Sequence, residues 1–181
     1  MGALNSLPDE PQYVGLAEKT GFSFEQIGIL HKRFKQLSNN GETLRREDFN
    51  TIPDLLCNPI RSEIIEAFFD RRNFRQTDAV GTVHEIGFGE FLLVMSHFRP
   101  PSIRLDDEQK EVIRTEKLRF LFNMHDTDND GTITLEEYRH EPDEFYEGIT
   151  FEHFNKLLKE FEVESRMNIR FMNMDTTTLC K

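Results

Sequence analysis

The chain has 181 residues, of which 37% are hydrophobic and 30% charged, and its formal net charge is −11. These values predict a globular protein of one large or two small domains, and they argue against nucleic acid or bare anionic membrane as main partners. An acidic surface instead suits divalent cations and basic peptides. The two distant cysteines, the lack of an apolar run of about 20 residues and the lack of a secretory signal favour a cytosolic protein.

The first six residues match M-G-x-x-x-[ST], the pattern for N-myristoylation, in which Gly2 is the acceptor after Met1 is removed. One myristoyl chain binds a membrane only marginally, so a second contact is needed. The next charges, Asp9 and Glu10, are acidic, and we therefore expect that second contact to be a protein. Residues 1–20 are predicted to be a myristoylated flexible N-terminus.

The first unit is expected to begin with a helix after Ser23, because Ser23 and Gln26 form a capping box. Apolar residues then recur at helical spacing as far as Leu37, and residues 38–41 predict a turn. This outline is typical of a helix–loop–helix calcium-binding unit. The turn lacks the carboxylates that would hold an ion. The basic residues at 31–35 are expected to form a solvated helix face.

A second unit follows, and Asn58–Pro59 predicts its start because proline suits the first turn of a helix. The loop at residues 70–90 is longer than the twelve residues of a standard calcium-binding loop, and its ligand set is broken. Residues 91–98 predict the exit helix. The basic cluster at 71–75 is interpreted as a solvated helix face. We expect no metal in either unit and assign residues 21–99 to an N-terminal lobe of two degenerate units.

Residues 100–106 begin with two prolines and are predicted to link this lobe to a second one. A long helix is then expected over residues 107–125. Its apolar residues Leu118, Leu121 and Phe122 are predicted to face the core. This helix delivers the chain into the most informative segment of the sequence.

Residues 126–137 read D-x-D-x-D-G-x-I-x-x-x-E, a complete calcium-binding loop of the EF-hand type. Such a loop surrounds Ca²⁺ with six to eight oxygen ligands. The expected ligands are the carboxylates of Asp126, Asp128, Asp130 and Glu137, the backbone carbonyl of Thr132, and Thr134 acting through a water molecule. Gly131 occupies the sixth position, where the backbone turns sharply. We predict one Ca²⁺ site here, with Mg²⁺ as a competitor.

A fourth unit is reduced to a remnant, because residues 148–154 resemble its exit but no ligand set precedes them. Only 11 residues separate Glu137 from Ile149, which is too few for an exit helix, a linker and an entering helix. Ile149 can still pair with Ile133 of the intact loop in a small β-bridge. We expect the shortening to weaken calcium affinity and to expose apolar surface.

The predicted fold is all-α, with EF-hand helix–loop–helix pairs in two lobes and short β-bridges between paired loops. Residues 107–140 hold the third unit with its intact loop. Residues 141–181 hold the remnant of the fourth unit and a C-terminal helix, so the C-terminal lobe is incomplete.

Four such units, the myristoylation pattern and one intact third loop together are similar to the calcineurin B homologous proteins over nearly the whole chain. The segments that carry the resemblance are 33–38, 58–62, 116–122, 133–139 and 146–152. The chain departs from that family by an internal deletion after residue 140.

The resemblance implies a non-catalytic calcium-responsive adaptor. Such proteins bind the cytosolic juxtamembrane helix of plasma-membrane sodium/hydrogen exchangers and promote exchanger maturation, surface stability and activity. It also implies an apolar groove that clasps the amphipathic target helix. The residues assigned to that groove are Phe34, Phe68, Phe69, Phe91, Leu92, Met95 and Phe98. The implied location is the cytoplasm, with plasma-membrane association through Gly2 and the exchanger, and with the nucleus as an alternative.

Two other functions remain open at this point. The chain could inhibit the Ser/Thr phosphatase calcineurin or replace its regulatory subunit, which the family resembles. It could also be a weakened isoform or a plain calcium buffer, although one intact loop in 181 residues gives little buffering capacity. An enzyme is not expected, because the sequence contains no nucleophile elbow, phosphate-binding loop or paired Cys/His metal set.

Overall fold

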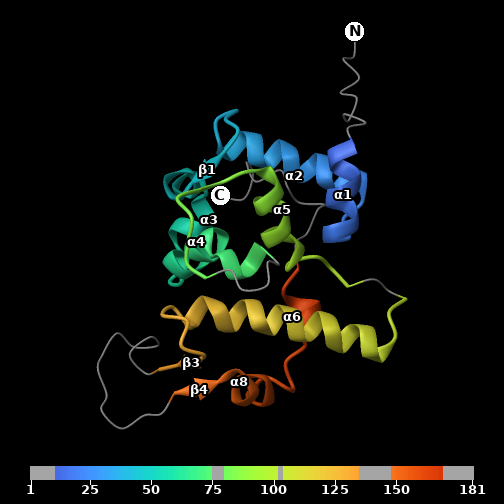
Figure 1. The fold of residues 1–181 in the computed structure, drawn as a ribbon, viewed down its shortest axis with the longest axis vertical. Coiled ribbons are helices and arrows are strands. Elements are labelled where there is room, and N and C mark those ends of the chain that lie inside the picture. Colours follow the sequence, from blue (N-terminus) through green and yellow to red (C-terminus); the bar gives the residue numbers. More distant parts are fainter. Residues whose placement is uncertain (1–10, 75–79, 102–103, 135–147, 169–181) are drawn as a thin grey trace.

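A computed structural model describes residues 11–74, 80–101, 104–134 and 148–168. Two groups of short elements lie on opposite sides of one long helix, α6 (Figure 1). The prediction of a mostly helical EF-hand fold is confirmed. None of the helices in these ranges combines the length and the apolar character that crossing a membrane requires.

The N-terminal lobe contains the elements of the first two units. They are α1 (Pro11–Thr20), α2 (Phe24–Leu37), β1 (Leu44–Arg45), η1 (Arg46–Thr51), α3 (Pro53–Leu56), α4 (Arg61–Phe69), η2 (Arg71–Phe74), β2 (Glu85–Ile86) and α5 (Phe88–Ser96). The remaining elements are α6 (Asp107–His125), β3 (Thr132–Ile133), β4 (Ile149–Thr150), α8 (Phe151–Leu157) and α9 (Val163–Arg166).

Local sequence signals fix two of these helices at their first turns. Ser23 caps α2, and the predicted capping box with Gln26 is present in both directions. Asp106 caps α6 in the same way together with Gln109. In each box a side-chain oxygen accepts from a backbone N–H that the helix itself leaves unpaired. The bounds of α6 match the predicted helix at residues 107–125.

Pairs of loops are joined by short antiparallel strands, as the fold prediction requires. Leu44 lies opposite Ile86 and joins the first two units. Ile133 lies opposite Ile149, so the intact loop keeps the predicted bridge to the fourth-unit remnant. Gly148 supports this turn with a φ of 76°, and an added Cβ there would lie 3.0 Å from the Cβ of Thr132.

Aromatic rings fill the core of the N-terminal lobe, and this corrects the groove prediction. Five of the seven assigned residues, Phe34, Phe68, Phe69, Phe91 and Leu92, are buried. The rings of the four phenylalanines contact one another or Phe49 and Phe88 at centroid distances between 4.9 and 5.9 Å. They therefore stabilise the lobe rather than line a groove, because side chains that pack on each other are not free to bind a target helix. Met95 and Phe98 are half-buried at the edge of this core.

Helix α6 contributes to both cores from opposite faces. Phe120 and Met124 belong to the N-terminal core, and Phe120 stacks on His97 at 4.8 Å. Leu118 and Phe122 are also buried, and the Phe122 ring contacts the rings of α8. These two i, i+4 pairs are offset by two residues, which places them on nearly opposite sides of a helix with 3.6 residues per turn.

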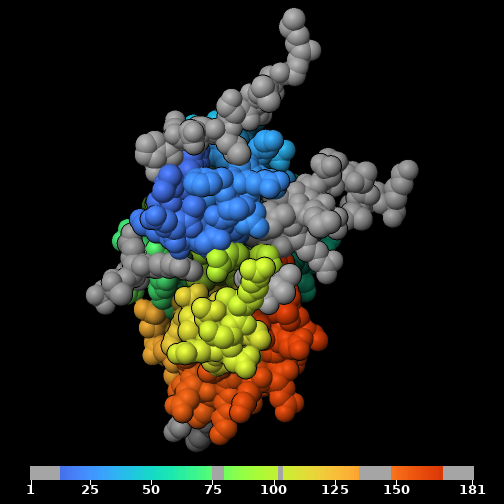
Figure 2. Space-filling view, turned by 90° about the vertical axis from the view of Figure 1, so that its right-hand side faces the viewer, coloured from blue at the N-terminus to red at the C-terminus, as the bar shows by residue number. Residues whose placement is uncertain are grey.

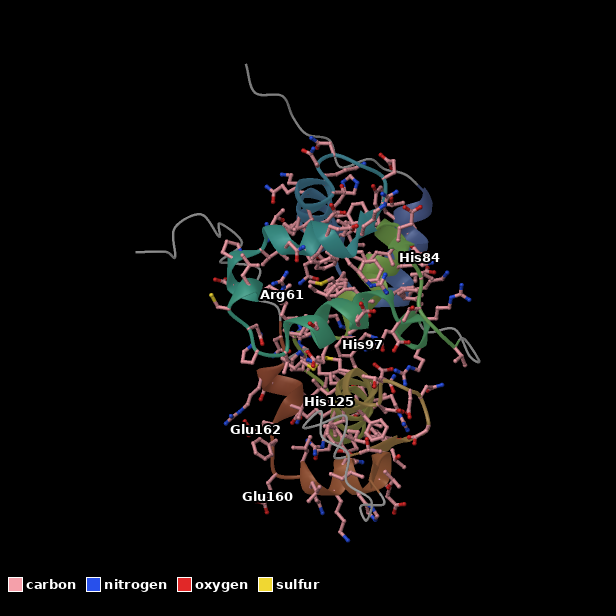
Figure 3. The ribbon with its side chains drawn as sticks, turned by 90° about the vertical axis from the view of Figure 1, so that its left-hand side faces the viewer. Arg61, His84, His97, His125, Glu160 and Glu162 are labelled. Carbon is pink, nitrogen blue, oxygen red and sulfur yellow. The ribbon has the colours of Figure 1, made fainter. Side chains whose placement is uncertain are left out.

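The position of α6 between the two lobes is also visible in Figures 2 and 3. Figure 3 shows His97 at the boundary between the lobes and His125 on α6, where the helix leads into the intact loop. Figure 2 shows the N-terminal part of α6, in yellow-green, at the surface between the N-terminal elements and the C-terminal ones.

Three predicted boundaries differ from the structure. The exit helix predicted at residues 91–98 is α5, Phe88–Ser96. Residues 11–20, which the sequence assigns to the flexible N-terminus, form α1, and this helix packs against α5 and α2. Tyr13 anchors it, because its ring contacts Phe88 and His31 at 6.2 Å each. Helix α4 begins at Arg61 rather than at Asn58–Pro59, and the Asn58 side chain accepts from the Ile60 N–H just before it.

Candidate metal centre

The intact loop leaves α6 at Asp126, and two residues with positive φ give it the required turn. Asn129 has a φ of 61° and Gly131 a φ of 87°. Nothing lies within 4 Å of the position where a Cβ on Gly131 would be. Glycine is therefore favoured there by backbone conformation and not by lack of space.

The three aspartate carboxylates of the loop come together. One oxygen from each of Asp126, Asp128 and Asp130 lies within 4.8 Å of the others. Oxygen ligands lie about 2.3–2.6 Å from Ca²⁺, so any two ligands of one ion can be no more than about 5 Å apart. The aspartates meet this condition, and hard carboxylate oxygens are the donors that Ca²⁺ prefers. The residues present therefore fit a calcium ion.

Backbone N–H groups hold these carboxylates in place. The Asp130 N–H donates to Oδ1 of Asp126 and to Oδ1 of Asp128, at 3.1 Å in each case. The Gly131 N–H donates to Oδ2 of Asp126 at 3.2 Å. Thr132 donates to Oδ1 of Asp130 at 2.7 Å through both its N–H and its hydroxyl. The positive ends of these dipoles offset part of the repulsion between the carboxylates.

The described residues contain part of the predicted ligand set. Thr132 lies in β3, where its neighbour Ile133 is buried, and Thr134 is half-buried just after the strand. Glu137, the predicted closing ligand, lies outside the described residues, as does the predicted myristoylation site Gly2. The first nine positions of the loop, residues 126–134, are thus the described part of the cage.

Arg72 reaches the loop from the N-terminal lobe, and the sequence does not predict this. A solvated helix face is expected for its basic cluster, but the Arg72 side chain is only 16% exposed. Its guanidinium donates to the backbone carbonyls of Asn123 and Asp126 and to the Asn129 side chain. It also forms an ion pair with Asp70. No local pattern distinguishes Arg72 from Arg71, which is exposed, so only the fold reveals it.

Side-chain cations occupy the loop regions of the two degenerate units. In the first unit the Lys35 ammonium donates to the Gly41 carbonyl at 3.1 Å. In the second unit Asp70 accepts two bonds from the Arg72 Nε, at 3.1 and 2.9 Å. In both units an oxygen acceptor of the loop region is thus satisfied by lysine or arginine.

Comparisons with known proteins agree with this site. A family model described as an EF-hand domain matches residues 117–140, the end of α6 and the intact loop. The chain is 45% identical to human calcineurin B homologous protein 3, over 99% of this chain and 100% of that protein. It is 48% identical to the Xenopus laevis protein of the same name, over 92% of this chain and 94% of that protein.

A more distant relative is the type 2 calcineurin B protein of Dictyostelium discoideum, 30% identical over 76% of this chain and 64% of that protein. The alignment with the human protein covers 216 positions, more than the 181 residues of this chain can fill. It therefore contains gaps on the side of this chain, as expected if an internal segment is missing. The chain belongs to the calcineurin B homologous proteins, a family of calcium-binding regulatory proteins.

Proposed function

We propose that this protein is a calcium-responsive adaptor for plasma-membrane sodium/hydrogen exchangers. It binds the cytosolic juxtamembrane helix of the exchanger and promotes maturation, surface stability and activity. The observation that carries this proposal is the position of the intact loop. The loop continues directly from α6, and α6 supplies core residues to both lobes.

We propose that the N-terminal lobe binds the target helix and that α6 transmits the effect of calcium binding to this lobe. An ion held by Asp126, Asp128, Asp130, Thr132 and Glu137, with Thr134 through water, fixes the C-terminal end of α6. Because Phe120 and Met124 of the same helix pack in the N-terminal core, a change at its end alters how that lobe packs. Mg²⁺ competes for this single site.

The surface proposed for the target is the α3–α4 corner rather than the buried phenylalanines. Here the apolar residues are exposed or half-buried, and Leu56 and Ile60 are 50% and 41% exposed. The residues of this α3–α4 patch are Ile52, Leu55, Leu56, Ile60 and Ile64. Helices α3 and α4 lie next to each other on one side of the lobe (Figure 1). An apolar patch of this kind suits one face of an amphipathic helix.

Myristoylation of Gly2 and a cytoplasmic location with plasma-membrane association complete the proposal. The acyl chain supplies one weak membrane contact and the exchanger supplies the second. Mass spectrometry of the N-terminus of protein made in eukaryotic cells tests the acylation. A Gly2→Ala variant that still fractionates with membranes when the exchanger is absent would contradict this arrangement.

The function is tested by calorimetric titration of the full chain with a peptide of the exchanger juxtamembrane helix, with calcium and with chelator. Binding is expected in calcium and is expected to weaken without it. Leu56→Asp should abolish binding, whereas Val112→Asp, an equally exposed apolar site on α6, should not. Equal binding by wild type and by Leu56→Asp would contradict the proposed surface.

The metal assignment is tested separately by calcium titration of wild type and Glu137→Gln. One binding event should be lost in the variant, because the closing residue supplies two of the oxygens around the ion. Unchanged heat would show that Glu137 is not a ligand. If the peptide binds equally to an Asp126→Ala variant, calcium is not needed for docking.

A second candidate is inhibition of calcineurin or replacement of its regulatory subunit. The similarity to the Dictyostelium type 2 calcineurin B protein favours it. A calcineurin phosphatase assay with added protein separates this function from exchanger binding. If neither the peptide nor the phosphatase responds while calcium still binds, the chain is a weakened isoform or a simple buffer.

A further inference from the structure

Arg72 connects the second unit of the N-terminal lobe to the calcium loop of the third. It lies in η2, and its Nη2 donates to the carbonyls of Asn123 and Asp126 at 3.0 and 2.9 Å. Its Nη1 donates to Oδ1 of Asn129 at 2.9 Å and lies 3.5 Å from Oδ2 of Asp126. One guanidinium therefore binds the last turn of α6, the first ligand residue and the turn of the loop.

These partners are the groups that set the shape of the loop. Asp126 is the first predicted ligand, and its carboxylate also accepts from the Asp130 and Gly131 N–H groups. Asn129 adopts a positive φ, which a non-glycine residue rarely does without support. By binding the Asn129 side chain, Arg72 stabilises that conformation. The arginine thus contacts the turn and both the backbone and the carboxylate of the first ligand residue.

We propose that Arg72 is a positioning residue for the cation site, so that this site is assembled from both lobes. Without it, the loop loses its link to the N-terminal lobe, and Asp126 and the Asn129 turn lose partners that hold them ready for the ion. The proposal rests on the calcium assignment above and adds a residue outside the loop that sets its affinity.

A positive charge beside a cation site would by itself weaken calcium binding through repulsion. Asp70 balances the guanidinium, because its Oδ2 lies 2.7 Å from Nη2 and 2.9 Å from Nε. The Arg72–Asp70 pair is thus close to neutral as seen from the loop. The planar guanidinium holds several acceptors in fixed directions. Positioning therefore outweighs repulsion, and loss of the pair should weaken calcium binding.

Calcium binding and the Arg72 contact between the lobes must affect each other by the same factor. If contact with the N-terminal lobe through Arg72 raises calcium affinity, then calcium must stabilise that contact by the same factor. The N-terminal side of the contact is the segment around Asp70, where Arg71 and Val83 N–H groups bond across the loop to Gly81 and Phe69. Calcium should slow amide exchange there, in the lobe that does not contain the site.

The test is calcium titration by calorimetry on the full chain. The double variant Arg72→Met with Asp70→Asn removes both charges together, so its effect reports positioning and not net charge. We expect calcium affinity to fall about tenfold, the lower end of the effect for residues that orient metal ligands. Arg72→Lys keeps the charge but loses the planar fork and should weaken affinity about threefold or more. Arg71→Met, an exposed neighbour, is the matched control and should stay within about twofold of wild type.

Hydrogen exchange supplies the second readout. In wild type, calcium should increase protection of the amides at Arg71 and Val83, and in the double variant this increase should disappear. If the double variant does not fold by circular dichroism, Arg72→Lys carries the same comparison. Affinity equal to wild type in the folded variants, or no calcium effect on these amides in wild type, would overturn the proposal. A wild type that binds no calcium would overturn the metal assignment as well, which separates the two failures.

Discussion

The two lobes are stabilised by different kinds of contact. The N-terminal lobe has a continuous aromatic core, in which Phe34, Phe49, Phe68 and Phe91 contact one another through their rings. In the C-terminal lobe α8 contains no fully buried residue, and Leu157 and Phe161 are 67% and 54% exposed.

Buried cations on α6 bind the C-terminal elements where apolar packing is thin. Arg114 donates to the carbonyls of Leu158 and Phe161 at 2.6 and 2.7 Å. The Lys117 ammonium has three N–H donors and lies within hydrogen-bond distance of four acceptors, the carbonyls of Arg99, Glu164 and Met167 and the Asn168 side chain, so one donor is shared. The Leu158 and Phe161 carbonyls also accept from the Phe161 and Val163 N–H groups, so Arg114 adds a second donor to each. Lys117 instead joins the segment after α5 to the residues around α9.

A lobe whose described helices after α6 are short can therefore stay attached to its neighbour through polar contacts. Nonpolar burial is tolerant of small shifts, whereas each bond of a buried ammonium depends on one direction and one distance. The C-terminal lobe should therefore be the more sensitive to loss of a single polar group, and the N-terminal lobe to loss of a ring.

The largest effect is expected for Phe69→Ala. Phe69 is fully buried, its ring contacts Phe49, and the Arg46 guanidinium lies 4.4 Å from the ring centroid. Loss of the ring leaves a cavity that should lower the free energy of unfolding by about 3–5 kcal/mol. Urea denaturation measures this value. The C-terminal counterpart, Phe161→Ala, should change it by less than about 1 kcal/mol because that ring is largely exposed. Equal losses would contradict the comparison.

Lys117→Met should have the next largest effect. The substitution keeps a side chain of similar length but removes the ammonium that lies against three part-buried carbonyls and one amide oxygen. We expect the free energy of unfolding to fall by about 2–3 kcal/mol. Lys110→Met, on the exposed face of the same helix, removes only a surface pair with Asp107 and should change it by about 0.5 kcal/mol or less. Similar values for the two lysines would show that the buried bonds contribute nothing.

Local features of both lobes could be predicted from the sequence. The capping box at Ser23, the bounds of α6 and the Ile133–Ile149 bridge all follow from neighbouring residues or from the fixed geometry of a calcium loop. These features depend on short-range chemistry that any fold containing the segment must satisfy.

The features that were not predicted depend on contacts between segments far apart in the sequence. Arg72, Arg114 and Lys117 look like ordinary surface cations in the sequence, and only the packing of α6 between two lobes buries them. The groove prediction includes five buried residues for a related reason. Phe69 and Leu92 lie at helical spacing, and this spacing is the same for a side chain facing a core and for one facing a target helix.

Lys117 should also change how the free energy of unfolding depends on pH, by less than the substitutions above change its value. Burial lowers the pKa of its ammonium group from 10.5 to about 8. Between these values the unfolded chain binds more protons at this residue than the folded chain, so this residue makes stability rise with pH. The difference in free energy of unfolding between wild type and Lys117→Met should therefore widen from pH 8 to pH 10.5. A difference that stays constant over this range would show that the pKa is not lowered.

The smallest effects are expected at the two capping boxes. Each box tests one hydrogen bond at the start of a helix, one on α2 in the N-terminal lobe and one on α6. Ser23→Ala removes the bond from the Gln26 N–H at 3.2 Å and should lower the free energy of unfolding by about 1 kcal/mol. Asp106→Ala removes a shorter bond, 2.7 Å from the Gln109 N–H, and also a negative charge at the N-terminus of α6. Because a charged acceptor binds more strongly and α6 serves both cores, the Asp106 variant should lose more, by roughly a further 0.5 kcal/mol. Urea denaturation at low salt measures both, and a larger loss for Ser23→Ala would mean that α6 is not the helix on which the two lobes depend.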